Sequence, residues 1–580
     1  MKKIDASNLM RRAGVAAITG TLVFAQVPVA ALAEGTAEAQ GQTTASGQPP
    51  EPPSGSGDGM GGQPGGSAPD GGSAPGNGAG GPGGGADTMS FDYSGTYSGT
   101  IGADGESVSA QDESFSATEA DVNAALAQNG GALALTGVQL DKSGDDTNGD
   151  NCNFYGLNSI LLSVGEGSTA TVKDSTLQAT SEGSNGIFAT DGASVLAKNV
   201  QISTTAGNSR GLDATYGGTI LAGDVDIRTQ GDHSGGVATD RGGGTISVQG
   251  GTIATEGSGS PIIYSTGDIQ VSGVTGTASG SQLVGMEGLN TVSIENSTLS
   301  SSQTEKTASD PIADGVIIYQ STSGDAEATT GETATFQAVD STLQSAISSG
   351  AMFYLTNTSA DVVLQNTTLD FDSNAADLLL AAGNDSNNWG NAGSNGATVR
   401  FTGINQTLSG DIVADTISSV DLHLTSGSGW TGAASIQENA AGSTSESPIT
   451  VNVDGTSTWV VTDNSTVSNL NVADGAQIVD AQGRTVTIVA GGQTVVQGDS
   501  DLTVTVTGSY STSYDGSTAG SADVTGIDRT AYDEAFGTED ASESTSSTAA
   551  DTASDTPSQE QQEDQGFFAA IIAWFKSLFS

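Results

Sequence analysis

Basic side chains are scarce in this sequence, and several lie close to acidic ones between residues 210 and 241. The chain has 15 lysines and arginines against 67 aspartates and glutamates. This segment, the charged belt, contains Arg210, Asp213, Arg228, Asp232, His233, Asp240 and Arg241. Paired carboxylates can protonate a glycosidic oxygen and activate water, and a base beside calcium-binding aspartates can abstract a sugar proton. Asp213, His233, Asp240 and Arg241 are therefore candidates for catalysis, although charge pairing on a solvated face is the default interpretation.

A second group of oxygen-bearing side chains has the spacing of a calcium loop. Asp146, Asn148 and Asp150 occupy the first, third and fifth places of such a loop. The sixth place lacks glycine, and Leu157 stands where a bidentate glutamate would. A turn built by Asn and Asp is the favoured alternative, so we expect no cofactor unless calcium binds here. Cys152 is the single cysteine, which excludes an internal disulfide and predicts a small buried residue.

A repeat of 25 residues predicts the elements that position these side chains. The segment from Gly186 to Gly192 returns at Gly211 to Gly217 and again at Gly236 to Gly242. On the same period Leu177, Ile202 and Ile227 follow one another, and Ile253 comes one residue late. Units this short, rich in Thr, Ser, Val and Ile, cannot bury an apolar face alone. We therefore expect stacked β-coils with these residues in one inward column, and hydrogen-bonded strand spacing between coils.

A second signature extends the coils from about Ala132 to about Thr507. A strand, then Asn or Asp, then Ser or Thr, then Leu recurs several times, and the five residues from Asp174 reappear verbatim from Asp340. Asn and Asp tolerate the left-handed backbone and suit a corner, where stacked amides can form ladders. Trp430 and the segment from Trp459 to Val472 bring larger side chains, as expected near a terminal cap.

The flanks of the coils differ in composition. Residues 1–33 have the basic start, apolar run and small cleavage residues of a secretory signal peptide, and 34–90 form a Gly/Pro-rich disordered stalk. Within the β-helix domain, 91–525, a short helix from Thr118 to Gln128 is expected to cap the first coil. Residues 526–565 are predicted to be an acidic disordered linker.

Residues 566–580 are predicted to form an amphipathic helix that is too short to span a bilayer. Its apolar side chains are predicted to contact a membrane interface or a partner groove, with a core helix packed on the last coil as the alternative. They are Phe567, Phe568, Ile571, Ile572, Trp574, Phe575, Leu578 and Phe579.

The coil pattern resembles the right-handed parallel β-helix proteins of pectin-lyase-like fold. The segment from Trp459 to Val472 is similar to the distal part of autotransporter-type adhesin passengers. Those adhesins carry a C-terminal membrane barrel, and no comparable series of strands follows Thr507, so we expect a surface protein without a barrel. The resemblance implies either attachment or polysaccharide cleavage. The recognisable lyase and polygalacturonase motifs of the family do not appear in the charged belt.

The charge and the repeats favour one function over the others. A formal net charge of −52 disfavours nucleic acid, because binding phosphates requires a basic surface. We expect a secreted adhesin-like protein, retained at a bacterial cell surface, that binds glycans or host and matrix proteins through a repetitive polar face. A polysaccharide lyase or glycoside hydrolase of the same fold is the alternative, and a structural envelope component is a third. An open groove at the charged belt would favour the enzyme.

Overall fold

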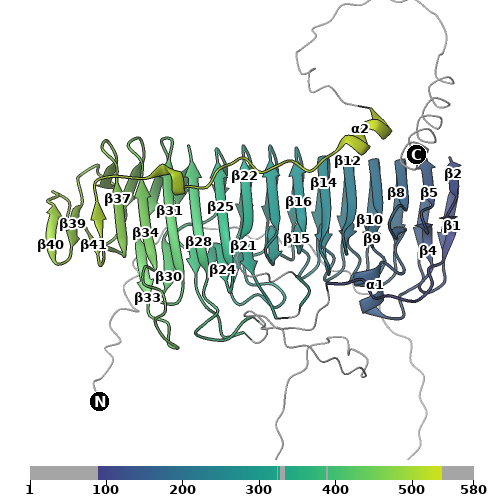
Figure 1. Cartoon of the computed structure of the whole chain (residues 1–580), viewed down its shortest axis with the longest axis horizontal. Helices are drawn as coiled ribbons and strands as arrows, with labels where there is room; N and C mark the ends of the chain where they lie inside the picture. The colour runs from purple at the N-terminus through teal and green to yellow at the C-terminus, as the bar shows by residue number, and fades with distance from the viewer. Residues whose placement is uncertain (1–88, 323, 327–332, 387–388, 538–580) are drawn as a thin grey trace, which may run out of the picture. The chain divides into compact units, whose positions relative to one another are not determined.

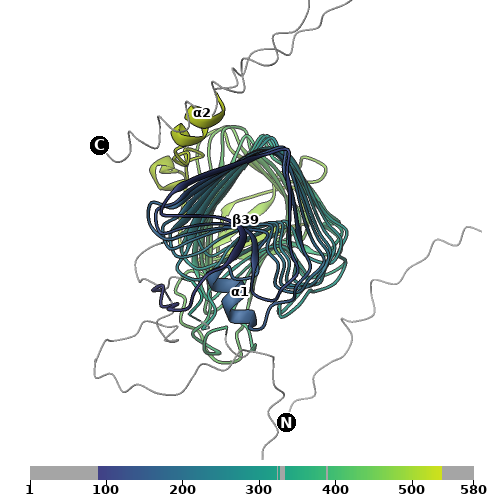
Figure 2. The same cartoon turned by 90° about the vertical axis from the view of Figure 1, so that its right-hand side faces the viewer.

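The computed structural model describes residues 89–322, 324–326, 333–386 and 389–537. They belong to the compact unit Gly66–Ser580 and fold almost entirely into parallel β-strands. Each turn of the chain adds one strand to each of several ladders, so that successive turns lie side by side (Figure 1). Viewed along the stack, the turns superpose around a common interior, which buried side chains fill (Figure 2). The stacked parallel β-coil predicted from the repeat is confirmed.

Sheet A is one continuous ladder that receives a strand from each successive turn. Its strands are, in spatial order, β1 (Gly99–Asp104), β4 (Asn123–Gln128), β7 (Leu161–Val164), β9 (Ile187–Thr190), β11 (Leu212–Ala214), β13 (Val237–Thr239), β15 (Ile263–Ser265), β18 (Val284–Glu287), β21 (Asp314–Tyr319), β24 (Ala351–Thr356), β27 (Asp377–Ala381), β30 (Ile412–Asp415) and β33 (Ala434–Gln437).

Sheet B consists of two ladders joined by four long strands that bend from one to the other. The long strands are β8 (Thr169–Ala179), β10 (Ser194–Thr204), β12 (Gly218–Thr229) and β14 (Gly244–Thr255). The first ladder also contains β2 (Ser107–Gln111), β5 (Ala132–Thr136), β16 (Asp268–Ser272), β19 (Thr291–Glu295), β22 (Ala334–Val339), β25 (Ser359–Gln365), β28 (Thr398–Ile404), β31 (Ser419–Thr425), β34 (Ile449–Val453), β37 (Asn469–Val472) and β42 (Tyr510–Ser511). The second contains β3 (Ser114–Ala117), β6 (Gln139–Lys142), β17 (Thr275–Ala278), β20 (Thr298–Ser301), β23 (Thr342–Ser345) and β26 (Thr368–Asp370).

Two small sheets complete the last turns. One is parallel and contains β29 (Thr407–Ser409), β32 (Gly429–Gly432), β35 (Thr458–Val461) and β38 (Gln477–Asp480). The other contains β36 (Ser465–Val467), β41 (Thr503–Val506), β39 (Thr487–Ala490) and β40 (Gln493–Val496). Here β39 and β40 pair antiparallel, so the parallel stacking ends. Just before this end Trp430 and Trp459 are fully buried with their rings 4.7 Å apart.

The described part of the chain holds three short helices, none long and apolar enough to cross a membrane. They are α1 (Gly149–Tyr155), η1 (Gly516–Thr518) and α2 (Thr530–Phe536). The capping helix expected from Thr118 to Gln128 is wrong. Asp121 has a positive φ of 57°, which suits a turn, and β4 follows between β1 and β7. Ala125 enters the solenoid core, and Leu126 packs on the opposite face of β4. Because β4 is buried on both faces, its sequence lacks the single apolar face that distinguishes an amphipathic helix.

The predicted inward column is confirmed. Leu177 pairs with Ile202, Ile202 with Ile227, and Ile227 with Ile253, and all four are at most 2% exposed. The repeated glycines explain why the column is regular. A Cβ at Gly186 would lie 2.4 Å from Cγ2 of Ile202, so only glycine lets the coil close on the isoleucine.

The predicted corners are also confirmed. Where the two ladders of sheet B meet, each corner contains a residue with positive φ. These residues are Asp112, Gly137, Asp174, Asn199, Asp224, Gly250 with Gly251, Gly273, Asn296, Asp340 and Asn366. Asn405 and Ser426 hold the same place where β28 and β31 lead into the small parallel sheet. Parts of the expected amide ladder are present, since Asn199 donates to Asp174 at 2.6 Å and Asn405 donates to Asn366 at 2.7 Å.

Residues 512–537, the C-terminal strap, run back from β42 across the first ladder of sheet B to α2 (Figure 1). Gln270 bonds the strap backbone twice, donating to Thr525 and accepting from Ile527, both at 2.8 Å. Tyr532 of α2 packs on the outward side chains of Leu196 and Leu221. Residues 526–537 therefore do not belong to the expected disordered linker. Its remainder, the signal peptide, the stalk up to residue 88 and the helix 566–580 lie outside the described residues.

Candidate functional site

The charged belt separates into two groups in the structure. Arg210 precedes β11, Asp213 lies on β11 and Asp240 follows β13, so adjacent turns bring the three together. Arg210 Nη2 lies 3.0 Å from Asp240 Oδ2, and Arg210 Nε lies 3.5 Å from Asp213 Oδ2. His233, by contrast, is exposed at a turn with a φ of 54°.

Arg228 and Asp232 also make surface contacts. Arg228 pairs with Glu256, and Asp232 accepts a hydrogen bond of 2.8 Å from the backbone of Ser258. The four catalytic candidates therefore do not converge on one point, because His233 is separate from the buried carboxylates.

Helix α1 covers the buried group. Asn153 accepts a hydrogen bond of 2.8 Å from Arg210, and the guanidinium of Arg241 lies 3.6 Å from the ring centroid of Phe154. Arg241 also pairs with Asp325 at 2.5 Å. Asp213 is 0% exposed and Asp240 5%, so this part of the belt is neither a groove nor a flat face.

Burial dominates the electrostatics of this group. It raises the pKa of Asp240 to about 7 even though Arg210 opposes the shift. Burial likewise raises the pKa of Asp213, again against Arg210, while the charge of Asp240 raises it further. A carboxyl titrating near neutrality suits acid–base catalysis, but these two face a covering helix instead of open space. The arrangement is that of a buried ion-pair cluster.

The calcium candidates take other roles. Asn148 is the N-cap of α1 and accepts hydrogen bonds from the backbones of Asp150 and Asn151 at 3.0 and 3.3 Å. The pKa of Asp146 is raised by burial and lowered by a hydrogen bond with Cys152. Cys152 is buried, as predicted, and burial raises the pKa of its thiol. The described residues contain no group of three or more His, Cys, Asp or Glu side chains arranged to hold a metal ion.

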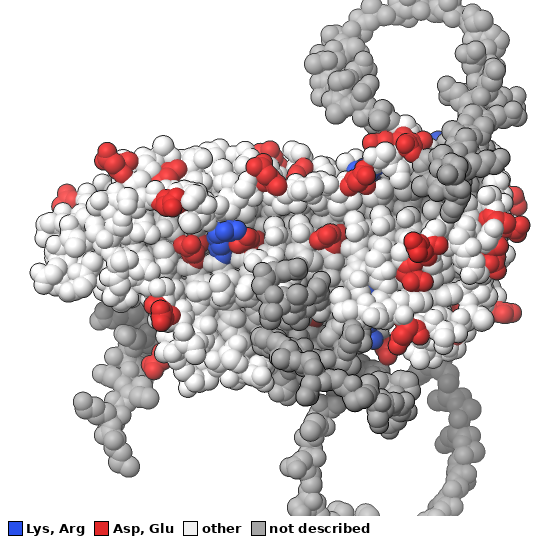
Figure 3. All heavy atoms as spheres, in the orientation of Figure 1, with Lys and Arg blue, Asp and Glu red and all other residues white. Residues whose placement is uncertain are grey.

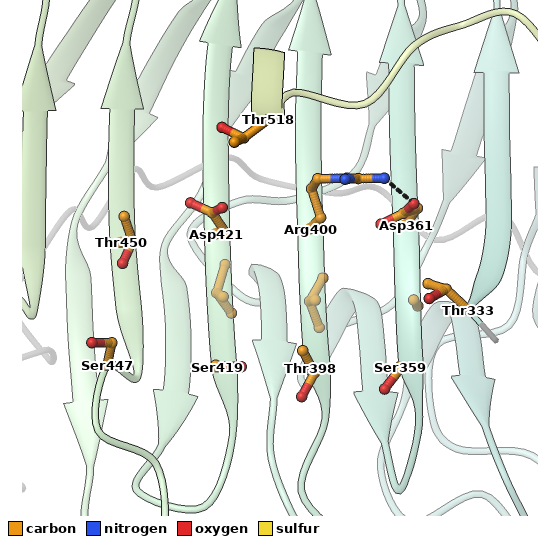
Figure 4. A pocket seen from close by; sticks show the side chains of 13 residues that line it. Thr333, Ser359, Asp361, Thr398, Arg400, Ser419, Asp421, Ser447, Thr450 and Thr518 are labelled. Atoms are coloured by element: carbon orange, nitrogen blue, oxygen red, sulfur yellow. Dashed lines mark hydrogen bonds and ion pairs between the residues drawn. The ribbon is translucent and has the colours of Figure 1, made fainter. Parts of the chain in front are cut away.

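An open groove of about 490 Å³ lies instead on the outer face of sheet B, along β25, β28, β31 and β34. A row of charged side chains crosses it: Asp361 pairs with Arg400, and Asp421 lies at the same register on the next strand (Figure 4). Sequence reasoning missed this site. A signal was present, because each of the three residues stands five places before a corner residue with positive φ.

Hydroxyl groups line the groove beside the charged row. Ser359, Thr398 and Ser419 form a second row two residues nearer the start of each strand (Figure 4). Thr518 of the C-terminal strap forms part of the wall. No aromatic side chain is among the described residues that line the groove. It therefore offers hydrogen-bond donors and acceptors at the repeat of the strands, but no ring for stacking.

The strap is held along one side of the groove by two contacts. Tyr514 lies with its hydroxyl 3.2 Å from Nδ1 of His423, and the backbone N–H of Gly520 donates to Thr402 at 2.9 Å. His423 is fully buried beneath the strap, with Nε2 3.1 Å from Asp421. Because the strap covers the row that contains Thr402 and His423, the Asp361 and Ser359 rows remain the open part of this face.

Comparison of the chain with protein-family models, with curated proteins and with solved structures finds no match to any of them.

Proposed function

We propose that this protein is a secreted, adhesin-like, right-handed β-helix of pectin-lyase-like type that binds glycans through the groove on sheet B. The observation that carries the proposal is the pairing of a charged row with a hydroxyl row in an open groove. Host or matrix proteins that present extended polar segments are the other ligands this face suits.

The chemistry of the groove fits a sugar chain bound by its edges. Sugar hydroxyls can donate to Asp361 and Asp421 and accept from Arg400, while Ser and Thr hydroxyls do both. Without an aromatic side chain in the lining, each contact is a modest hydrogen bond. Useful affinity then requires several sugar units to bind successive strands, which a repetitive surface provides.

The surface charge supports a polar extracellular ligand. Most of the charged side chains on the face drawn in Figure 3 are acidic. Such a surface keeps a long Ser/Thr-rich chain soluble and repels polyanions such as nucleic acids. Secretion by the segment 1–33 and retention at the cell surface by the apolar side chains from Phe567 to Phe579 complete the proposal.

Removing Arg400 tests the groove. Arg400→Ala is expected to weaken binding to the glycans recognised on an array by at least about tenfold, since a charge-assisted hydrogen bond contributes roughly 1.5–3 kcal/mol. Arg228→Ala is the matched control, because Arg228 also forms an exposed pair with an acid, Glu256, outside the groove. Equal loss in both variants, or none in either, contradicts binding at the groove.

The enzyme alternative has one observation in its favour. Asp361 and Asp421 lie on strands separated by one strand, a spacing of about 9.6 Å between the backbones. Inverting glycosidases separate their carboxyl groups by about 6.5–9.5 Å, a range that two side chains leaning toward each other from these backbones would enter. Arg400 between the two is paired with Asp361, which reduces the room for a reacting water.

We expect the purified protein to leave polygalacturonate and similar polymers intact, with or without calcium. The assay measures unsaturated and reducing ends over many hours, beside an active lyase as a positive control. Reproducible release that Asp361→Asn or Asp240→Asn abolishes would replace the adhesin proposal by the enzyme. Release that survives both variants indicates a contaminating enzyme.

A further inference from the structure

Two buried aspartates outside the groove have carboxylate oxygens that lack a hydrogen-bond partner among the described residues. Asp310 lies in the loop between β20 and β21, and Asp314 is the first residue of β21. They are 6% and 5% exposed. Both carboxylate oxygens of Asp314 and Oδ2 of Asp310 have no hydrogen-bond partner among the described residues. This is unusual, because buried polar groups in folded proteins are almost always hydrogen-bonded.

The two aspartates stand four residues apart in the sequence, and the charge of one affects the other. Burial raises the pKa of Asp314, and the charge of Asp310 raises it further. Burial raises the pKa of Asp310 to about 7, opposed by Lys306. Burial also raises the pKa of Tyr354 to about 12, and the charges of Asp314 and Asp310 are among the smaller causes.

The loop is longer than the equivalent link in the regular turns. Residues 302–313 join β20 to β21, whereas residues 205–211 join β10 to β11. The additional length contains Asp310, four residues before Asp314. Two buried carboxylates cannot both remain charged without a counter-charge, since each isolated ion would cost far more than the fold can compensate. Lys306 is a nearby positive charge, but it is exposed and single, so a proton or a bound cation must neutralise the rest of the pair.

We propose that Asp310 and Asp314 bind a calcium ion that fixes this loop against sheet A. Carboxylate oxygens are the ligands that Ca²⁺ prefers, and backbone carbonyls and water can complete its shell of six to eight oxygens. The three unpartnered oxygens distinguish this pair from the Asp146 loop, where Asn148 already caps a helix. The site is independent of the groove on sheet B.

Thermal unfolding in calcium and in EGTA at pH 7.5 tests the site. At a calcium concentration about 100 times Kd, the Tm of the wild type is expected to rise by roughly 3 °C. Asp310→Asn and Asp314→Asn should abolish the rise and the calcium-binding heat in titration calorimetry. In EGTA the Tm of both variants should equal or exceed that of the wild type, because an amide of the same size as the carboxylate removes the repulsion between Asp310 and Asp314.

The control is Asp370→Asn, which removes an exposed aspartate from β26 and should keep the calcium response. A wild-type Tm that is insensitive to calcium, and that rises at lower pH by more than the Tm of Asp310→Asn and Asp314→Asn, would replace the ion by a shared proton. The comparison is needed because both variants keep the contribution of Asp240. A calcium response that persists in both Asp310→Asn and Asp314→Asn, and disappears in Asp146→Asn, would move the site to the helix α1 loop. Either result overturns the proposal.

Discussion

Replacing Ile202 by aspartate is expected to lower the free energy of unfolding by several kcal/mol. Ile202 is 2% exposed and stands between Leu177 and Ile227 in the inward column, so the new carboxylate would have no partner in an apolar interior. A repeat stack is held together by contacts between neighbours, and a defect in one turn also weakens the turns on either side. Chemical denaturation followed by circular dichroism measures the loss.

Lys198→Asp provides the matched control on the same strand. Lys198 is half-buried and stands four residues before Ile202 in β10, where the change exchanges one charged side chain for another. We expect its effect to stay near the range of ordinary surface substitutions, about 0.5 kcal/mol. If both variants unfold at the same denaturant concentration, Ile202 does not belong to the core.

The regular turns could be predicted from the sequence because the physical constraint repeats with them. Each turn needs an inward aliphatic residue, a glycine opposite it and a residue that accepts positive φ at the corner. Ile202, Gly186 and Asn199 fill these roles in one turn. A single such triplet would carry little information, but its recurrence every 25 residues fixes the period, the inward face and the corner together.

The first turn shows where this reasoning failed. Thr118 and Gly130 supply credible ends for a helix, and the Ala-rich segment between them has high helix propensity. The strand β4 forms instead because β1 and β7 offer hydrogen bonds on both sides and both of its faces are buried. Pairing with neighbouring strands overrides local helix propensity here. The residues of a single turn do not reveal which strands will lie on either side of it.

Neither the burial of the belt nor the groove could be predicted, because both depend on irregular segments. Helix α1 covers Arg210 through Asn153, and nothing in the repeat indicates where that helix packs. The groove in turn needs the strap, which places Tyr514 beside His423, a residue 91 positions earlier in the chain. Periodicity locates residues on strands, whereas the loops and the chain end decide which outward side chains remain open.

Removing Arg210 from its buried pairs with Asp213 and Asp240 is expected to have the second large effect on stability. Replacing Arg210 by methionine is expected to destabilise the fold by about 3–5 kcal/mol at pH 8, because the carboxylate of Asp240 loses its counter-charge while still buried and Asp213 loses the same partner. Arg228→Met, at a pair whose arginine side chain is 59% exposed, should change stability by at most about 1 kcal/mol. A small effect at Arg210 would mean that solvent reaches the cluster.

The pH dependence of these variants distinguishes a buried ion-pair cluster from a general packing defect. The pKa of Asp240 in the folded protein, about 7, lies above its ordinary value of 3.8. The contribution of Asp240 to the free energy of unfolding is therefore fully present below about pH 4, and it is lost as the pH rises through 7. Asp480, whose pKa is lowered to about 2, acts at lower pH and does not mask this trend. Wild-type stability should thus fall from pH 5 to pH 8.

In the Arg210→Met variant the fall should be steeper, since the protonated carboxyls at low pH do not require a counter-charge, whereas the carboxylates at high pH do. A pH-independent difference between the two proteins would indicate lost packing alone.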